Sequence, residues 1–294
     1  MYLPRKFIDA ALPGVVGTGS GLLLRDLPRH LSPYMLFLVM SANFEELDYC
    51  RTAIGELSLR RRRVMSMGGA EVYEVKIDNQ LLMSSVVNQS EIALAELGLC
   101  DLGGTELDVV VGGLGLGYTA AAALKHPGVS SVLVIEYLAQ VIGWHERGLV
   151  PLGGQLTSNE RCRLIHGDFF ELASTPDTGF DPHAPGRRFH AILLDIDHSP
   201  SSVLHASHAG FYTPDGLSRL VRHLHPGGVL ALWSADPPED DVLRLLDTAF
   251  VSANAHPVHF HNPLLNSDDV NTVYVGRTDS GSRGPQRSIE VQDS

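Results

Sequence analysis

The stretch Leu107-Asp-Val-Val-Val-Gly112-Gly-Leu-Gly-Leu-Gly117-Tyr-Thr-Ala-Ala-Ala-Ala-Leu-Lys125 decides the fold. Its first five residues form a continuous apolar run apart from Asp108, which is typical of a parallel strand covered on both faces. Four glycines follow within six residues, and an alanine-rich segment then predicts a helix. Strand, glycine loop and helix in this order predict the first unit of a doubly wound α/β sheet.

The same alternation continues toward the C-terminus. Buried strands are predicted at 132–135, 161–165, 189–194 and 229–233, and helices at 138–147, 214–224 and 240–250. Two further strands, at 258–260 and 272–275, follow each other without a helix between them. A closing antiparallel hairpin indicates a methyltransferase-like (Rossmann-like) sheet of seven strands, because a dinucleotide-binding sheet continues with parallel crossovers.

A different pattern precedes this domain. Short extended runs at 56–63, 71–78 and 81–87, separated by turn residues, predict a small antiparallel β unit. Ser90 is expected to cap a helix over 91–99. The resulting domain prediction has four parts: an N-terminal segment without a predicted fold (1–54), the small β unit with the first helix (55–100), the α/β domain (101–277) and a disordered tail (278–294).

Composition excludes several classes of function. The 294 residues contain 22 Lys and Arg against 34 Asp and Glu, a net charge of −12, so a nucleic-acid partner is not expected. The arginines Arg60–Arg63 are interpreted as a solvated strand edge. The longest apolar run, 34–40, is too short to cross a membrane. Three widely spaced cysteines favour a reducing compartment, and a cytoplasmic location is expected.

Acidic residues at successive strand ends predict a nucleoside site. The loop glycines Gly112, Gly113, Gly115 and Gly117 would let backbone N–H groups approach a ligand, although glycine there also serves close packing. Glu136 follows the second strand, where an acid accepts ribose hydroxyls. Asp168 follows the third and could accept an adenine amino hydrogen; each acid could instead be a solvated loop carboxylate. Their order along the chain favours a bound adenosine-type nucleoside.

The fourth strand leads into Asp195-Ile-Asp197-His198. If the strand continued, the two carboxylates would share one face and could hold a cationic amine for attack; the alternative is helix capping before Pro200. His198, His205 and His208 lack a matching acid or cysteine cluster, so no metal is predicted.

These residues resemble a known family. Gln-Ser-Glu91, the 112–117 loop, Ile-Glu136, Gly-Asp168 and Leu-Leu-Asp195 follow the order found in spermidine synthases and related polyamine aminopropyltransferases, over about residues 55–277. The resemblance implies decarboxylated S-adenosylmethionine as donor, a small cationic amine as acceptor, and a homodimer or larger homo-oligomer. It also implies that Glu136 holds the ribose, Asp168 the adenine, and that Asp195 orients and deprotonates the amine.

Five positions depart from the family. Its loop typically reads Gly-Gly-Gly-Asp-Gly-Gly, whereas Leu114 and Gly115 stand here at the third and fourth positions. The second acid of the family is His198 here, beside Asp197. An acceptor-site tyrosine corresponds to Gln89, and a glutamine to Leu82. Loss of the loop acid relaxes discrimination against the carboxylate of ordinary S-adenosylmethionine, and thereby favours methyl transfer or another acceptor.

Four functions follow in order of preference. The first is aminopropyl transfer to an amine in polyamine biosynthesis, and the second is S-adenosylmethionine-dependent methyl transfer on the same fold. The third is a non-catalytic nucleoside-binding protein. A nicotinamide-dependent dehydrogenase comes last, because the terminal hairpin argues against it.

Overall fold

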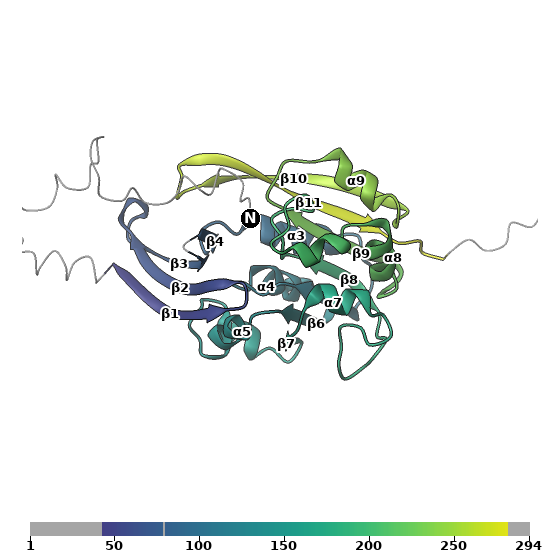
Figure 1. Ribbon diagram of the computed structural model, residues 1–294, viewed down its shortest axis with the longest axis horizontal. Helices are drawn as coiled ribbons and strands as arrows, with labels where there is room; N and C mark the ends of the chain where they lie inside the picture. The colour runs from purple at the N-terminus through teal and green to yellow at the C-terminus, as the bar shows by residue number, and fades with distance from the viewer. Residues whose placement is uncertain (1–42, 79, 282–294) are drawn as a thin grey trace, which may run out of the picture.

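The computed structural model describes residues 43–78 and 80–281 (Figure 1). The smaller of its two sheets is antiparallel, in the order β1-β2-β3-β4. Its strands are β1 (Phe44–Thr52), β2 (Gly55–Val64), β3 (Ala70–Ile77) and β4 (Gln80–Ser84), and a short 3-10 helix η1 (Met65–Met67) joins the middle two. The predicted small antiparallel unit is therefore present.

The larger sheet has seven strands in the order β10-β11-β9-β8-β5-β6-β7. The central strands are parallel, and β10 and β11 run antiparallel at one end. Its strands are β5 (Leu107–Gly112), β6 (Val129–Glu136), β7 (Cys162–His166), β8 (Phe189–Leu194), β9 (Leu224–Ser234), β10 (Ser252–Asn262) and β11 (Ser267–Arg277). The predicted α/β class, with seven strands and a terminal hairpin, is confirmed.

Helices cover both faces of the large sheet. They are α3 (Gln89–Leu99), α4 (Tyr118–Lys125), α5 (Ala139–Glu146), α6 (Gly153–Thr157), α7 (Phe169–Ser174), α8 (Pro214–Val221) and α9 (Asp240–Leu246), with a 3-10 helix η2 (Ala206–Gly210). Side chains of α3 to α6 share one core with the small sheet, and those of α7 to α9 share a second core. Val109 and Val111 of β5 point into the first core and Val110 into the second, which explains the apolar run.

Two N-terminal predictions are wrong. Residues 44–52 form β1 of the small sheet, so the boundary at residue 55 is too late; residues 1–42 lie outside the described part. Arg60–Arg63 do not lie on an edge, because β2 is flanked by β1 and β3. Each arginine instead pairs with a glutamate of a neighbouring strand. Opposite charges across neighbouring strands stabilise this central position.

Several element boundaries also differ from expectation. Asn88 rather than Ser90 precedes α3, and the Ser90 hydroxyl donates to its neighbour Glu91 instead. Residues 226–228 lie between the predicted helix at 214–224 and the predicted strand at 229–233, yet they are part of the longer β9. Thr278 and Asp279 were assigned to a disordered tail, yet both make backbone hydrogen bonds to the start of β9. The remainder of that predicted tail, 282–294, lies outside the described residues.

The closing hairpin extends beyond the sheet. β10 and β11 pair with each other over eleven residues each, whereas β11 pairs with β9 only from Thr272 to Arg277. In Figure 1 the distal half of this yellow hairpin projects toward the small sheet. A space is thereby enclosed between the carboxyl ends of β8 and β9, the small sheet and the hairpin.

Candidate functional site

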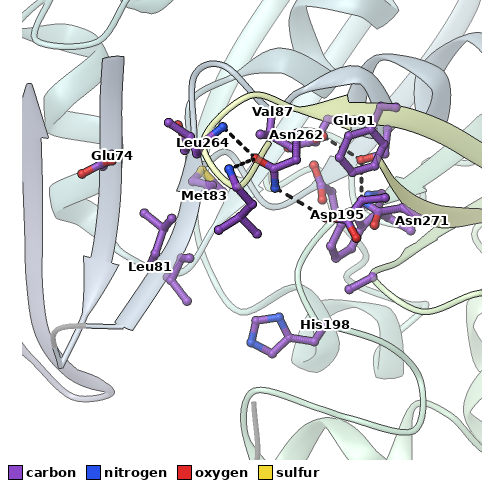
Figure 2. A pocket seen from close by; sticks show the side chains of 18 of the residues that line it. Glu74, Leu81, Met83, Val87, Glu91, Asp195, His198, Asn262, Leu264 and Asn271 are labelled. Atoms are coloured by element: carbon purple, nitrogen blue, oxygen red, sulfur yellow. Dashed lines mark hydrogen bonds between the residues drawn. The ribbon is translucent and has the colours of Figure 1, made fainter. Parts of the chain in front are cut away.

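A cavity of about 610 Å³ occupies this space (Figure 2). Its volume lies within the range of small-molecule sites. Residues that follow β8 and β9 form one wall, the strands β2 to β4 form another, and the hairpin closes the cavity. The cavity is lined in part by charged, polar or sulfur-containing side chains, among them Arg60, Arg62, Glu74, Lys76, Met83, Ser84, Glu91, Asp195, His198, Trp233 and Asp236.

Asp195 lies in the cavity wall directly after β8. Its backbone N–H donates to the Gly112 carbonyl at 2.8 Å, which ties the residue to the first residue of the glycine loop. The Thr119 hydroxyl donates to Asp195 Oδ2 at 2.7 Å. Burial raises the pKa of Asp195 to about 6, although the Thr119 hydrogen bond acts in the opposite direction. Near neutral pH, Asp195 is thus a carboxylate poised to accept a proton.

Glu91, in the first turn of α3, is the second acid of the cavity. Burial, and secondly the charge of Asp195, raise its pKa to about 8. The Ser90 hydroxyl donates to Glu91 Oε2 at 2.9 Å and accepts from Asn271 Nδ2 of the hairpin at 2.8 Å. Glu91 and Asp195 therefore carry close to one negative charge between them at neutral pH, and a proton is available on Glu91.

Replacement of Glu91 by glutamine is expected to change how stability depends on pH. The native state keeps a proton on Glu91 up to about pH 8, whereas the unfolded chain releases it near the ordinary pKa of 4.5. The free energy of unfolding of the wild type therefore falls as pH rises from about 5 to 8. The difference in stability between Glu91→Gln and the wild type should shift in favour of the variant by roughly 3–4 kcal/mol over that window. Urea unfolding at several pH values measures this difference.

Glu96→Gln, at an exposed position of the same helix, provides the matched control. Its free energy of unfolding, plotted against pH, should run parallel to that of the wild type. Parallel curves for Glu91→Gln as well would show that Glu91 ionises normally in the folded protein.

Four polar atoms in the cavity wall have no hydrogen-bond partner among the described residues. They are Ser84 Oγ, His198 Nε2, Trp233 Nε1 and Arg60 Nε. Burial lowers the pKa of His198, so its imidazole is biased toward the neutral form. Since buried polar groups in native proteins normally find partners, these atoms are suited to receive polar groups of a ligand.

The glycine loop lies next to the cavity and requires its glycines. Gly113 has φ +93°, and a Cβ there would lie 2.2 Å from the Asp195 carbonyl oxygen. Leu114 N–H donates to Glu136 Oε2 at 2.9 Å, and Leu138 N–H donates to Oε1 at 2.7 Å. Burial raises the pKa of Glu136, while backbone hydrogen bonds oppose the rise. The backbone on both sides of the carboxylate therefore holds Glu136 in place at the end of β6.

Met83 of β4 separates the loop from the cavity. It lines the cavity, and a Cβ at Gly115 would lie 2.5 Å from its Cε and 2.7 Å from its Sδ. The Gly115 carbonyl in turn accepts a hydrogen bond from the buried His145 Nε2 at 2.9 Å. The space above Gly115 is therefore filled by a flexible thioether rather than by a carboxylate.

The remaining predicted site residues occupy other positions. Asp168 begins α7, where its Oδ1 accepts from Phe170 N–H at 2.8 Å and Glu171 N–H at 3.2 Å. Helix capping is thus one function of Asp168. Gln89 is exposed and accepts from Asn88 N–H at 3.0 Å, and it does not line the cavity.

Asp197 does not share a face with Asp195, because β8 ends at Leu194 and the chain turns. Its buried carboxylate accepts hydrogen bonds from Leu204 N–H at 2.7 Å and Tyr212 OH at 2.9 Å. His208 Nδ1 lies 2.8 Å from the same carboxylate. The structure therefore brings Asp195 and His198 into the cavity, but not Asp197.

Sequence reasoning assigned no chemistry to two of these residues. Glu91 belongs to the family resemblance without an assigned function, and its signal is an acid in the first turn of a mostly apolar helix. Trp233 is the other: its strand is predicted to be buried, yet its side chain lines the cavity.

Among residues 43–78 and 80–281, no group of three or more His, Cys, Asp or Glu side chains is arranged to hold a metal ion. Within the same ranges, no helix is both long enough and apolar enough to span a membrane.

No family model matches the chain. Similar solved structures include a spermidine synthase in complex with the transition-state analogue AdoDATO, with a TM-score of 0.61 and 14% identity over 79% of this chain and 73% of that one. The chain has the fold of spermidine synthases. The spermidine synthase from Thermotoga maritima matches with a TM-score of 0.59 and 14% identity, over 79% of this chain and 72% of that one. A probable spermidine synthase from Corynebacterium glutamicum ATCC 13032 matches with a TM-score of 0.53 and 15% identity, over 78% of this chain and 79% of that one.

Proposed function

We propose that this protein is a transferase that moves an aminopropyl group from a decarboxylated S-adenosylmethionine-type donor to a small amine. The observation that carries the proposal is the placement of Asp195. It faces a ligand-sized cavity, and its backbone is hydrogen-bonded to the loop in which a nucleoside donor would bind. The fold shared with spermidine synthases, one of them bound to AdoDATO, supports the same function.

The residues present fit a nucleoside donor. The glycine loop passes so close to the Asp195 carbonyl at Gly113 that it has no room for a Cβ, and it can therefore form a backbone cradle for the ligand. Glu136 is held at the end of β6 by two backbone N–H groups. Glu136 would accept the ribose hydroxyls, and Asp168 keeps Oδ2 for the base. When bound, the donor supplies an electrophilic carbon attached to a sulfonium and a neutral thioether leaving group.

Asp195 performs the acid–base part of the reaction. An ammonium acceptor that enters the cavity gives its proton to the Asp195 carboxylate, because burial brings the pKa of this group to about 6. The neutral nitrogen then forms a bond to the donor carbon as the carbon–sulfur bond breaks. The product leaves as a secondary ammonium, and Asp195 returns the one proton that it took to solvent. Thr119 holds Asp195 in place, and the apolar walls exclude water.

Methyl transfer from S-adenosylmethionine is the second candidate, and one observation favours it. Met83 occupies the space above Gly115, where the family resemblance places an acid that pairs with the donor's ammonium. An apolar group there removes electrostatic selection against a donor that carries a carboxylate.

Calorimetric titration with three nucleosides distinguishes these functions. Decarboxylated S-adenosylmethionine, S-adenosylmethionine and S-adenosylhomocysteine would each be titrated into the protein. Aminopropyl transfer predicts preference for the decarboxylated donor by about tenfold or more, about 1.4 kcal/mol. Preference for the two carboxylate-bearing nucleosides would identify a methyltransferase. Failure of all three to bind would refute both candidates.

Glu136→Ala is expected to weaken nucleoside binding at least about tenfold, because two hydroxyl–carboxylate hydrogen bonds are lost. The same titration measures the effect, and thermal melting checks that the loop stays folded without the Leu114 hydrogen bond. Exposed Glu160, in the turn before β7 and at the opposite edge of the sheet, supplies the control variant Glu160→Ala. Unchanged affinity in Glu136→Ala would place the nucleoside elsewhere.

A non-catalytic nucleoside-binding protein remains the third candidate. It predicts tight nucleoside binding without release of methylthioadenosine or S-adenosylhomocysteine in the presence of any amine. Product analysis by mass spectrometry therefore separates it from the two transferases.

A further inference from the structure

The cations that line the cavity all lie on one of its walls, opposite the acids Glu91 and Asp195. The wall built from α3 and the carboxyl ends of β8 and β9 carries Glu91, Asp195 and Asp236. The wall built from the small sheet carries Arg60, Arg62 and Lys76, together with Glu74. Figure 2 shows Glu74 on its strand at one side of the cavity and Glu91 and Asp195 at the other. A long ligand would therefore meet acids at one end and cations at the other.

The strand geometry explains the basic wall. Arg60 and Arg62 lie two residues apart on β2 and so share a face, and Arg60 is paired in register with Glu74 on β3. Lys76 lies two residues beyond Glu74, on the same face of the sheet. Arg61, between the two cavity arginines, points to the other face and pairs with Glu45 at 2.6 Å.

The wall has more positive charge than its own carboxylates neutralise. Arg62 is paired with Glu74 at 2.7 Å and Arg60 with Glu46 at 3.3 Å. Arg60 Nε is buried and has no hydrogen-bond partner among the described residues. Lys76 makes no ion pair within 4.0 Å in the described part of the chain. Burial, and next the charge of Arg60, lower the pKa of Lys76, as expected for a cation without a close carboxylate.

We propose that the acceptor is a zwitterion: an amine whose nitrogen binds at Asp195 and Glu91 and whose far end carries a carboxylate held by Arg60 and Lys76. The proposal rests on the function proposed above and names its acceptor class. A carboxylate would accept hydrogen bonds from the unpartnered Arg60 Nε–H and from the Lys76 ammonium. Both donors are charged, which strengthens such hydrogen bonds. The second ammonium of a diamine would instead face these two cations and would be repelled.

Binding of two matched series of compounds tests the proposal. Straight-chain ω-amino acids and α,ω-diamines of equal lengths would be titrated into the full-length protein saturated with methylthioadenosine. The best amino acid is expected to bind at least about tenfold more tightly than the best diamine. Lys76→Met and Arg60→Met should each remove most of this preference by weakening the amino acid alone.

Arg61→Met is the matched control, because it removes the same charge from the same strand on the face away from the cavity. It should leave both affinities unchanged. Lys76→Met protects the test against misfolding, since it breaks no ion pair, whereas Arg60→Met breaks the pair with Glu46. Thermal melting of each variant verifies the fold.

Tighter binding of diamines by the wild type, or equal loss in Arg61→Met and Lys76→Met, would overturn the zwitterion proposal. The two proposals fail separately. Transfer to a diamine in preference to an amino acid would uphold the transferase and refute the acceptor class. Charge-dependent binding of an amino acid without transfer from any donor would uphold the acceptor class and refute the transferase.

Discussion

Asp195→Asn should reduce turnover by roughly 10²–10⁴-fold, the range typical of general acid–base groups. An asparagine keeps the shape of the side chain and can still contact the Thr119 hydroxyl, but it cannot accept the amine proton. Nucleoside affinity should stay nearly unchanged, because Glu136 and the loop N–H groups remain in place. Steady-state kinetics of product formation, together with nucleoside titration, measure both quantities.

The stability of this variant supplies an internal control. Burial raises the pKa of Asp195 to about 6, so the ionised carboxylate destabilises the native state above that pH. A neutral amide should therefore leave the variant at least as stable as the wild type at pH 8, even though turnover is lost. Asp101→Asn, at an exposed aspartate, should alter neither property. Turnover equal to that of the wild type in Asp195→Asn would exclude Asp195 as the base.

Gly113→Ala should cost about 3–5 kcal/mol of folding free energy, from left-handed backbone strain plus overpacking. The alanine Cβ would lie 2.2 Å from the Asp195 carbonyl oxygen and 3.0 Å from the carbonyl carbon. Neither atom belongs to a flexible side chain, so the loop and the end of β8 would have to separate. Urea unfolding measures the loss, and nucleoside binding should weaken in parallel because the cradle is deformed.

Gly143→Ala is the control for this substitution. Gly143 lies within α5, and no atom outside its own helix stands within 4 Å of a Cβ placed there. Alanine should stabilise that helix by roughly 0.5–1 kcal/mol. If Gly113→Ala were as harmless as Gly143→Ala, the close contact between loop and strand would be absent in solution.

The large sheet could be predicted because its signals are local. The run around Val109, Val110 and Val111 indicates a strand buried on both faces, and the two cores that receive these side chains confirm it. The strand Phe189–Leu194 and the first residue of the helix at Pro214 were predicted with their exact boundaries. β1 escaped prediction because its residues are largely exposed and polar, and only pairing with β2 makes them a strand.

A site residue could be predicted from the sequence only where it directly follows the end of a strand. Asp195 follows β8 directly, so the sequence places it at the functional edge of the sheet. The partnership of Asp195 with Glu91 depends on the packing of α3 against the sheet and has no local signature. Asp197 was misjudged because a turn after Leu194 sends its carboxylate to Tyr212 and His208. The basic wall depends on which residues of β2 and β3 lie opposite each other. This register cannot be deduced from the sequence of either strand alone.

The overhanging hairpin bears on the timing of catalysis. The part of β11 before Thr272 has no pairing with β9, and a two-stranded ribbon has little stability of its own. Phe260 and Leu264 on this ribbon close the cavity, while Asn271 fastens its base to Ser90 at 2.8 Å. Lifting of this part of the ribbon would break no pairing with β9, so ligand exchange would not require global unfolding. Release of product would then proceed at the rate of this local opening rather than at the rate of the chemical step.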